Sequence, residues 1–135
     1  MAQVALDADV IIAFLDAADD QHERAVDELP PRLAAGDRVL VCASVFAEVM
    51  VRPSQHGTEA TVDEFLDAIG ATVVVVDRGL ARRAAHLRAR HPALRLPDAL
   101  SLAAALTSGA ELLTFDHALS RSAQREGVSG WWSVS

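Results

Sequence analysis

The stretch LPDALSLAAALTSGAELLTFD, residues 96–116, has the pattern of a helix followed by a short strand and an acid. Pro97 suits the first turn of a helix that is rich in Ala and Leu, and Gly109 suits the end of that helix. The next residues, Glu111 to Phe115, read as a short apolar strand that ends at an acid, Asp116. A helix followed by a buried strand is the repeating unit of an α/β fold.

The rest of the chain alternates in the same way. Apolar strands are predicted at 3–6, 38–42, 71–76 and 111–115, with an edge strand at 128–134. Helices are predicted at 9–17, 44–51, 58–69, 77–90, 97–109 and 118–126. The polar stretch 19–36 has a helical pattern that Pro30 and Pro31 interrupt, and Pro53 is expected to bar the helix before it from continuing. Continuous apolar strands of this kind, separated by helices, predict one α/β domain over residues 1–135, with a central, mainly parallel sheet of four to five strands flanked by helices.

Composition excludes several classes of protein. The chain has 135 residues, a net charge of −7 and 51% apolar residues, which is typical of a globular domain and argues against wholesale electrostatic binding of nucleic acid. No apolar run is long enough to cross a membrane, and the N-terminus does not resemble a signal peptide, so a cytoplasmic location is expected. Cys42 is alone, which excludes a disulfide framework within the chain.

Carboxylates interrupt four apolar stretches: VALDADVIIAFL, VLVCASVFAEVMV, LRLPDALSLAAAL and ELLTFDHAL. An ionised carboxylate is rarely buried unless it is paired or binds a metal, because removing the charge from water costs several kcal/mol. Acids from four distant segments therefore suggest a site for a hard divalent cation. The acids concerned are Asp7 with Asp9, Glu48, Asp98 and Asp116.

Each acid also has a structural role that would account for it when it is taken alone. Asp7 or Asp9 could cap the first helix, and Asp116 could cap the last. Asp98 lies in the first turn of its helix, where the helix dipole favours a negative charge. Glu48 lies among apolar residues, so a buried ion pair with an arginine is its alternative role.

Three segments together carry a resemblance to a known family: LDADVIIAFLDAADDQH, VCASVFAEVM and LPDALSLAAALTSGAELLTFD. In this order and spacing the chain resembles the PIN-domain ribonucleases, and specifically the VapC toxins of bacterial toxin–antitoxin pairs. The resemblance covers nearly the whole chain. It implies a PIN-like three-layer fold and a metal-dependent endoribonuclease activity.

The resemblance also implies roles for individual residues. The acidic quartet of the family falls on Asp7, Glu48, Asp98 and Asp116 of this chain. We expect Asp7 and Asp98 to bind a first Mg²⁺ or Mn²⁺ ion, and Asp116 to help hold that ion or a second one. Glu48 would bind the ion or orient a water molecule, and Asp9 and Thr114 would support the site. Where many members have a further acid two residues after the last one, this chain has Ala118.

Partners follow from the same resemblance. The family implies an RNA substrate, a VapB-type antitoxin whose C-terminal segment lies along the acidic cleft, and a homodimer. Six of the twelve arginines lie between residues 78 and 95, and Arg78, Arg82 and Arg83 are candidates for RNA contact. An ordinary solvated helix face would account for that stretch equally well. Trp131 and Trp132 could stack on bases or pack in the core.

Other functions stay open on the sequence alone. A PIN-domain nuclease in RNA processing, with no antitoxin, would have the same residues. The motif Asp7-x-Asp9 after an apolar strand is also similar to the start of haloacid-dehalogenase-like phosphatases. That family needs a lysine downstream, and this chain contains no lysine. A binding protein without catalysis is a fourth possibility, against which the presence of all four acids argues.

Overall fold

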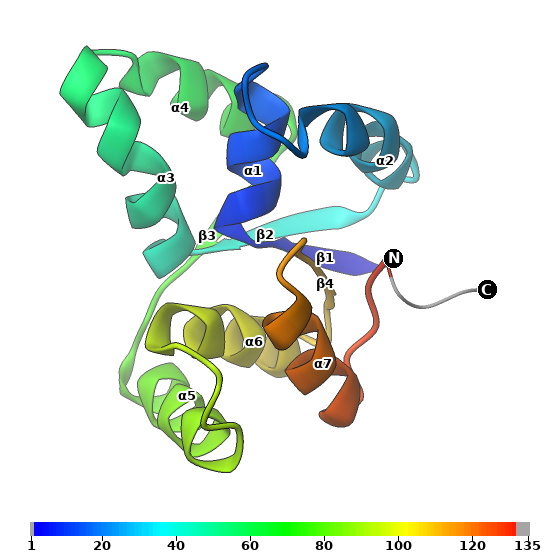
Figure 1. The fold of residues 1–135 in the computed structure, drawn as a ribbon, viewed down its shortest axis with the longest axis vertical. Helices are drawn as coiled ribbons and strands as arrows, with labels where there is room; N and C mark the ends of the chain where they lie inside the picture. Colours follow the sequence, from blue (N-terminus) through cyan, green and yellow to red (C-terminus); the bar gives the residue numbers. More distant parts are fainter. Residues whose placement is uncertain (1, 132–135) are drawn as a thin grey trace.

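The computed structural model describes residues 2–131, which fold into four strands and seven helices (Figure 1). In chain order these elements are β1 (Gln3–Leu6), α1 (Ala8–Leu15), α2 (His22–Ala34), β2 (Arg38–Cys42), α3 (Ala43–His56), α4 (Glu59–Ala68), β3 (Thr72–Val74), α5 (Arg78–Arg90), α6 (Leu96–Ser108), β4 (Glu111–Leu113) and α7 (His117–Arg125).

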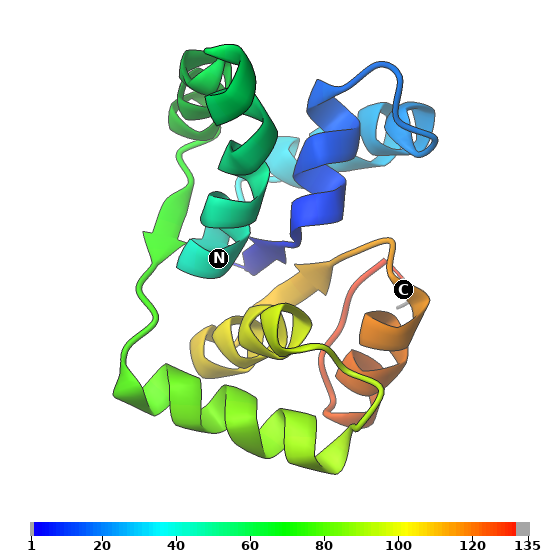
Figure 2. The ribbon, with the colours of Figure 1, turned by 60° about the vertical axis from the view of Figure 1, so that its left-hand side comes forward.

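The four strands form one parallel sheet in the order β3-β2-β1-β4. Helices α1 to α4 lie on one side of this sheet and α5 to α7 lie on the other, as the two ribbon views agree (Figures 1 and 2). The predicted α/β architecture, a parallel sheet of four strands between two helical layers, is therefore confirmed.

The hydrophobic core lies between the sheet and the helices that cover its two faces. Strands β1 and β4 are almost fully buried, as their continuous apolar sequences predict. Helix α6 presents small residues such as Ala99, Ala103 and Ala104 to its surroundings, all at most 1% exposed. Small side chains let the helix approach the sheet closely, and Leu102 between them fills the remaining space. Gly109 ends the helix with a φ of 65°, a conformation that a glycine adopts without strain.

The strand order reverses next to β1, and this reversal positions the site. The chain builds β1, β2 and β3 outward in one direction and then returns to add β4 on the other side of β1. Leu6 at the end of β1 pairs with Leu113 at the end of β4. The residues that follow these two strands therefore emerge side by side, at the switch point where open α/β sheets bind their ligands.

The prediction that Pro30 and Pro31 interrupt the second helix is wrong, because α2 runs through both. Each proline removes one intrahelical hydrogen bond. Pro30 and Pro31 are exposed, so the carbonyl groups that lose their partners can be hydrated. Ala25 and Leu29 are fully buried and hold the helix on the core, which offsets this loss.

The predicted end of α3 before Pro53 is also wrong, since the helix continues to His56. The carbonyl of Pro53 accepts backbone hydrogen bonds from Gly57 and Thr58, the latter at 2.9 Å. Gly57 has a φ of 70° and closes the helix in the left-handed conformation. The proline therefore lies inside the last turn, which its own carbonyl helps to close.

Two predictions about strands fail in the described residues. The valine run 71–76 was expected to be a buried strand, but β3 is at the edge of the sheet, with Val73 42% exposed and Val75, just beyond it, 73% exposed. Residues 128–131 form no strand, although the carbonyl of Ser129 accepts a hydrogen bond from Leu112. The remaining residues of the predicted edge strand, 132–134, lie outside the described part of the chain.

Within residues 2–131, no helix has the length and apolar character needed to span a membrane.

Candidate functional site

Asp7 is the most buried acid of the site. It follows β1 at the N-cap position of α1, yet its side chain forms no capping hydrogen bond and is only 6% exposed. Its carboxylate instead accepts hydrogen bonds from the Thr114 hydroxyl at 2.8 Å and from the Ser101 hydroxyl at 3.3 Å. The carboxylate is therefore directed at the switch point between β1 and β4, and helix capping does not account for its position.

Asp9 lies one residue into α1 and faces the loop that follows β4. Its carboxylate accepts a hydrogen bond from the backbone N–H of Phe115 at 3.0 Å, and the Thr114 hydroxyl lies 3.3 Å from the same oxygen. Asp9 is half-buried. Asp7 and Asp9, which follow β1, thus both bind the segment that follows β4.

Asp116 and Asp98 come from the two elements beside this loop. Asp116 caps α7, because its Oδ1 accepts a hydrogen bond from the N–H of Leu119 at 2.8 Å. Its predicted capping role is confirmed. Asp98 lies in the first turn of α6 and pairs with the exposed Arg95, whose Nε is 3.4 Å from Oδ2.

Three of these acids have raised pKa values, with burial as the main cause and the charges of the neighbouring acids as a further one. Burial raises the pKa of Asp7 to about 6, and the negative charges of Asp98 and Glu48 contribute. Burial raises the pKa of Asp9 to about 7, with the charges of Asp7 and Asp116 contributing. Burial also raises the pKa of Asp98, against the opposing effect of Arg95. Acids that disfavour one another's charge in this way create a strong demand for a cation.

The donor set suits a hard divalent ion by its chemistry. All the candidate groups are carboxylates or hydroxyls, which are the ligands of Mg²⁺ and Mn²⁺, and none is a thiolate or an imidazole. In the part of the chain that the structure describes, no three of these acids converge as a ready-made metal-binding group. Mg²⁺ needs only one or two protein carboxylates, because it retains waters and takes oxygens from its substrate.

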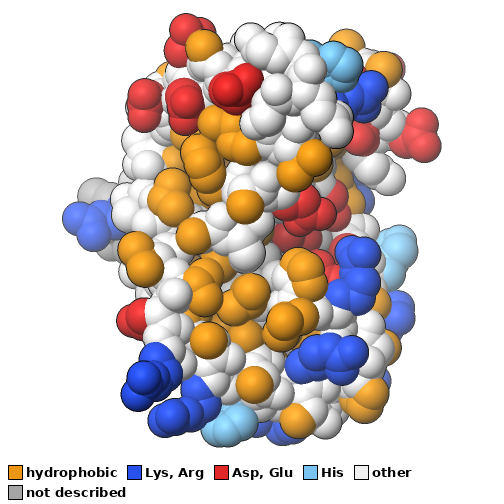
Figure 3. All heavy atoms as spheres, turned by 90° about the vertical axis from the view of Figure 1, so that its left-hand side faces the viewer, with side chains coloured by type: hydrophobic (Ala, Val, Ile, Leu, Met, Phe, Trp, Pro, Cys, Tyr) orange, Lys and Arg blue, Asp and Glu red, His pale blue; other side chains and the backbone are white. Residues whose placement is uncertain are grey.

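Acidic side chains gather in a hollow near the middle of one face of the molecule, and arginine side chains lie beside them (Figure 3). A family model of the PIN domain matches residues 4–124, a range that includes every acid of this site. The chain belongs to the PIN domain family. No curated protein sequence matches it significantly.

Solved structures with the same fold include a toxin–antitoxin complex and a single toxin. FitAcB from Neisseria gonorrhoeae superposes on this PIN domain with a TM-score of 0.72 at 20% identity, covering 98% of this chain and 100% of the other. Mycobacterium tuberculosis VapC20, a toxin that cleaves the sarcin–ricin loop, gives a TM-score of 0.71 at 20% identity, covering 89% and 95%. A toxin–antitoxin complex from Klebsiella pneumoniae gives 0.66 at 24% identity, covering 84% and 87%.

Glu48 of this PIN domain differs from its expected environment. It was predicted to be surrounded by apolar side chains, but it lies on an exposed face of α3, and no residue from 2 to 131 forms an ion pair with it. Val45 and Val49, four residues apart, lie on the buried face of α3, whereas Glu48 lies on an exposed face. Its charge still contributes to the pKa of Asp7, so Glu48 lies at the solvent side of the cluster.

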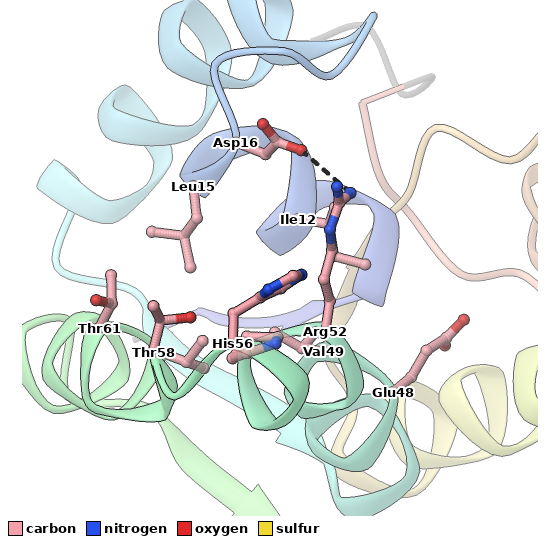
Figure 4. A pocket seen from close by; sticks show the side chains of 11 residues that line it. Ile12, Leu15, Asp16, Glu48, Val49, Arg52, His56, Thr58 and Thr61 are labelled. Atoms are coloured by element: carbon pink, nitrogen blue, oxygen red, sulfur yellow. Dashed lines mark ion pairs between the residues drawn. The ribbon is translucent and has the colours of Figure 1, made fainter.

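Glu48 also lines a large cavity beside the acidic site. This cavity of about 650 Å³ lies between α1, α3 and α4, and its walls include Ile12, Leu15 and Val62 (Figure 4). Arg52 and His56 point into it from α3, and Arg52 forms a long ion pair with Asp16 at 4.0 Å. The cavity is mainly apolar and adjoins the acidic site through Glu48.

The candidate arginines do not join the acids. Arg78, Arg82 and Arg83 are exposed on α5, and none of them forms an ion pair with a candidate acid among the described residues. Arg83 donates instead to the Thr107 hydroxyl at 3.3 Å. Of the arginine-rich stretch, Arg95 is the residue that contacts the site.

Ser101 is a site residue that the sequence analysis missed. Its hydroxyl is buried and donates to Asp7. The available signal was its spacing, because Ser101 follows Asp98 by three residues and therefore lies on the same face of α6. Serine is common in Ala-rich helices, so this spacing alone does not identify a site residue.

Proposed function

We propose that this PIN domain is a metal-dependent endoribonuclease that acts as the toxin of a toxin–antitoxin pair. The observation that carries the proposal is the burial of Asp7 at the switch point, among acids that raise its pKa. Such an arrangement destabilises the metal-free protein, and a divalent cation would relieve it. The family membership and the likeness in fold to solved structures of toxins support the same conclusion.

The roles follow from position and burial. Asp7 and Asp98 would bind the ion, and Oδ2 of Asp116 would serve as a third ligand, because Oδ1 is the oxygen that caps the helix. The hydroxyls of Thr114 and Ser101 orient the Asp7 carboxylate toward the site and favour its ionised form. A bound Mg²⁺ or Mn²⁺ would supply activation of water and neutralisation of phosphate charge.

Two residues at the solvent side would handle the substrate. Glu48 is exposed and close enough to affect Asp7, which suits a group that orients the attacking water or takes its proton. Arg95 is paired with Asp98 at the edge of the cluster and could release it to bind a phosphate oxygen. Arg78, Arg82 and Arg83 would contact RNA farther from the acids.

The antitoxin proposal rests on charge and on the cavity of Figure 4. A basic side chain from a partner could neutralise the acids, and the apolar walls near Ile12 and Val62 would accept its neighbouring apolar residues.

A homodimer is proposed as well, with the exposed valines at the sheet edge as candidate contacts. A nuclease in RNA processing would have the same active site but no such partner.

Incubation of the purified protein with total RNA tests the proposal. We expect cleavage with Mg²⁺ or Mn²⁺ and none with EDTA. Fragment ends would then show which bonds are cut. Co-expression with the product of a neighbouring small gene should suppress the cleavage if the protein is a toxin. Hydrolysis of a small phosphomonoester without cleavage of RNA would favour the phosphatase alternative.

A further inference from the structure

A second cavity, of about 250 Å³, lies beside the acids on the side of α7, and we call it the α7 cavity. Its wall next to the acidic site is Thr114, the residue whose hydroxyl binds Asp7. From there it follows one face of α7, since Ser120, Arg121 and Gln124 come three, four and seven residues after His117 and all line it. A ligand in the α7 cavity would therefore be continuous with one bound at the acids.

The α7 cavity contains a cation that the fold does not use. Arg121 is exposed and forms no ion pair with any residue between 2 and 131. Arg24, on the opposite wall, is already paired with Glu28 at 2.9 Å. In a chain with a net charge of −7, a free arginine next to the acidic site is well placed to hold an anionic strand there.

The remaining walls are aromatic and polar. Phe115 and Trp131 stack with their ring centroids 4.9 Å apart, and the Arg24 guanidinium lies 4.7 Å above the Phe115 ring. The indole N–H of Trp131 is buried, and none of the described residues accepts a hydrogen bond from it. The stacked rings and the guanidinium over them form one wall of the α7 cavity.

We propose that the α7 cavity binds the RNA nucleotide adjacent to the cleaved bond, an inference that rests on the proposed nuclease function. Arg121 forms a forked pair of hydrogen bonds to the phosphate of that nucleotide. The amide of Gln124 contacts the edge of its base, and His117, the residue after Asp116, lines the same cavity. The free cation, the amide and the position next to Thr114 favour a nucleotide, because its phosphate pairs with Arg121, its base edge pairs with Gln124 and its backbone continues toward the acids.

Binding of a short, labelled single-stranded RNA tests this inference in an Asp98→Asn background, where cleavage is blocked. Arg121→Ala should raise the dissociation constant about tenfold, as expected for loss of hydrogen bonds to a charged group. It should also reduce the slope of log Kd against log salt by about 0.7, the value for one phosphate contact on a single strand. Arg121→Lys keeps the charge and should give an intermediate affinity. With Asp98 restored, Arg121→Ala should raise KM far more than it lowers kcat.

Arg125→Ala is the matched control, because Arg125 lies four residues farther along α7, is also exposed and does not line the cavity. Equal losses in the Arg121 and Arg125 variants, or no loss in either, would overturn the inference while leaving the nuclease intact. Displacement of the RNA by poly-glutamate, with loss of that competition in Arg121→Ala, would assign the cavity to an acidic protein segment instead. Failure of the parent protein both to bind and to cleave RNA would overturn the proposed function, and this inference with it.

Discussion

The Thr114 hydroxyl lies 2.8 Å from Oδ2 of Asp7 and links the ends of two neighbouring strands, β4 and β1. Each residue directly follows its strand, and the backbone N–H of Asp7 also donates to the carbonyl of Leu113 at 3.0 Å. The pairing of β1 with β4 therefore fixes the position of the Asp7 carboxylate. The geometry of the candidate site is a consequence of the sheet register.

Thr114→Val should lower the free energy of unfolding and reduce kcat/KM at acid pH. Loss of the hydroxyl leaves a buried carboxylate oxygen without this donor, at a cost of about 1–3 kcal/mol in the free energy of unfolding. It also raises the pKa of Asp7 above its value of about 6, so the acid limb of kcat/KM should move roughly half a unit to one unit toward higher pH. Thr114→Ser should restore both properties. An unchanged pH profile in Thr114→Val would contradict the role given to this hydrogen bond.

Asp9→Asn should stabilise the metal-free protein at alkaline pH. The pKa of Asp9 is about 7 in the folded state and near 3.8 in the unfolded chain, so the folded state binds more protons between these values. The free energy of unfolding therefore falls as the pH rises from about 4 to 7. Removing the charge should recover about 1–3 kcal/mol at pH 8 and little at pH 4. Urea unfolding in EDTA measures this, with the exposed Asp63→Asn on α4 as control.

Mg²⁺ should raise the melting temperature of the protein. If the dissociation constant is roughly 1 mM, 10 mM ion stabilises the fold by about 1.4 kcal/mol, which corresponds to roughly 3–6 °C for a domain of this size. The shift should be strongly reduced in Asp7→Asn and retained in Asp63→Asn. Equal shifts in all three proteins would show that the ion binds elsewhere.

Glu126→Gln should destabilise the packing of α5 against the end of α7. The Glu126 carboxylate accepts hydrogen bonds from Arg90 at 3.0 and 3.2 Å and lies 2.7 Å from Nε2 of His91. The hydrogen bonds from Arg90, followed by that from His91, lower the pKa of Glu126. Its stabilisation is thus present above the ordinary pKa of a glutamate and is lost as the pH falls through the lowered value. A loss of about 1 kcal/mol is expected at pH 7 and a smaller one at pH 3 by urea unfolding, with the exposed Glu64→Gln as control.

The sequence predicts the backbone around the candidate site well where local patterns determine it. The end of β1 just before Asp7, the start of α6 within one residue of Pro97 and the acid after β4 are all readable, because apolar strands and helix caps are local features. Burial of a given residue is less readable, because it depends on which face of a helix meets the core. Glu48 was therefore misplaced, and β3 was taken as buried although the topology puts it at an edge.

The two prolines of α2 also show that local sequence does not reveal tertiary packing. Pro30 and Pro31 weaken α2 locally, but packing of Leu29 on the core is a tertiary effect that the local sequence does not reveal. Ser101 was missed for a related reason, since its hydroxyl matters only because α6 passes beside Asp7.

The most direct test of the account is single-turnover cleavage of one RNA oligonucleotide, chosen from the bonds cut in total RNA, by three proteins with Mg²⁺. The unmodified protein and Asp63→Asn should cleave at the same rate, whereas Asp98→Asn should be slower by a factor of about 100 or more while remaining folded. Similar rates in all three proteins would contradict the assignment of the acidic cluster as the catalytic centre.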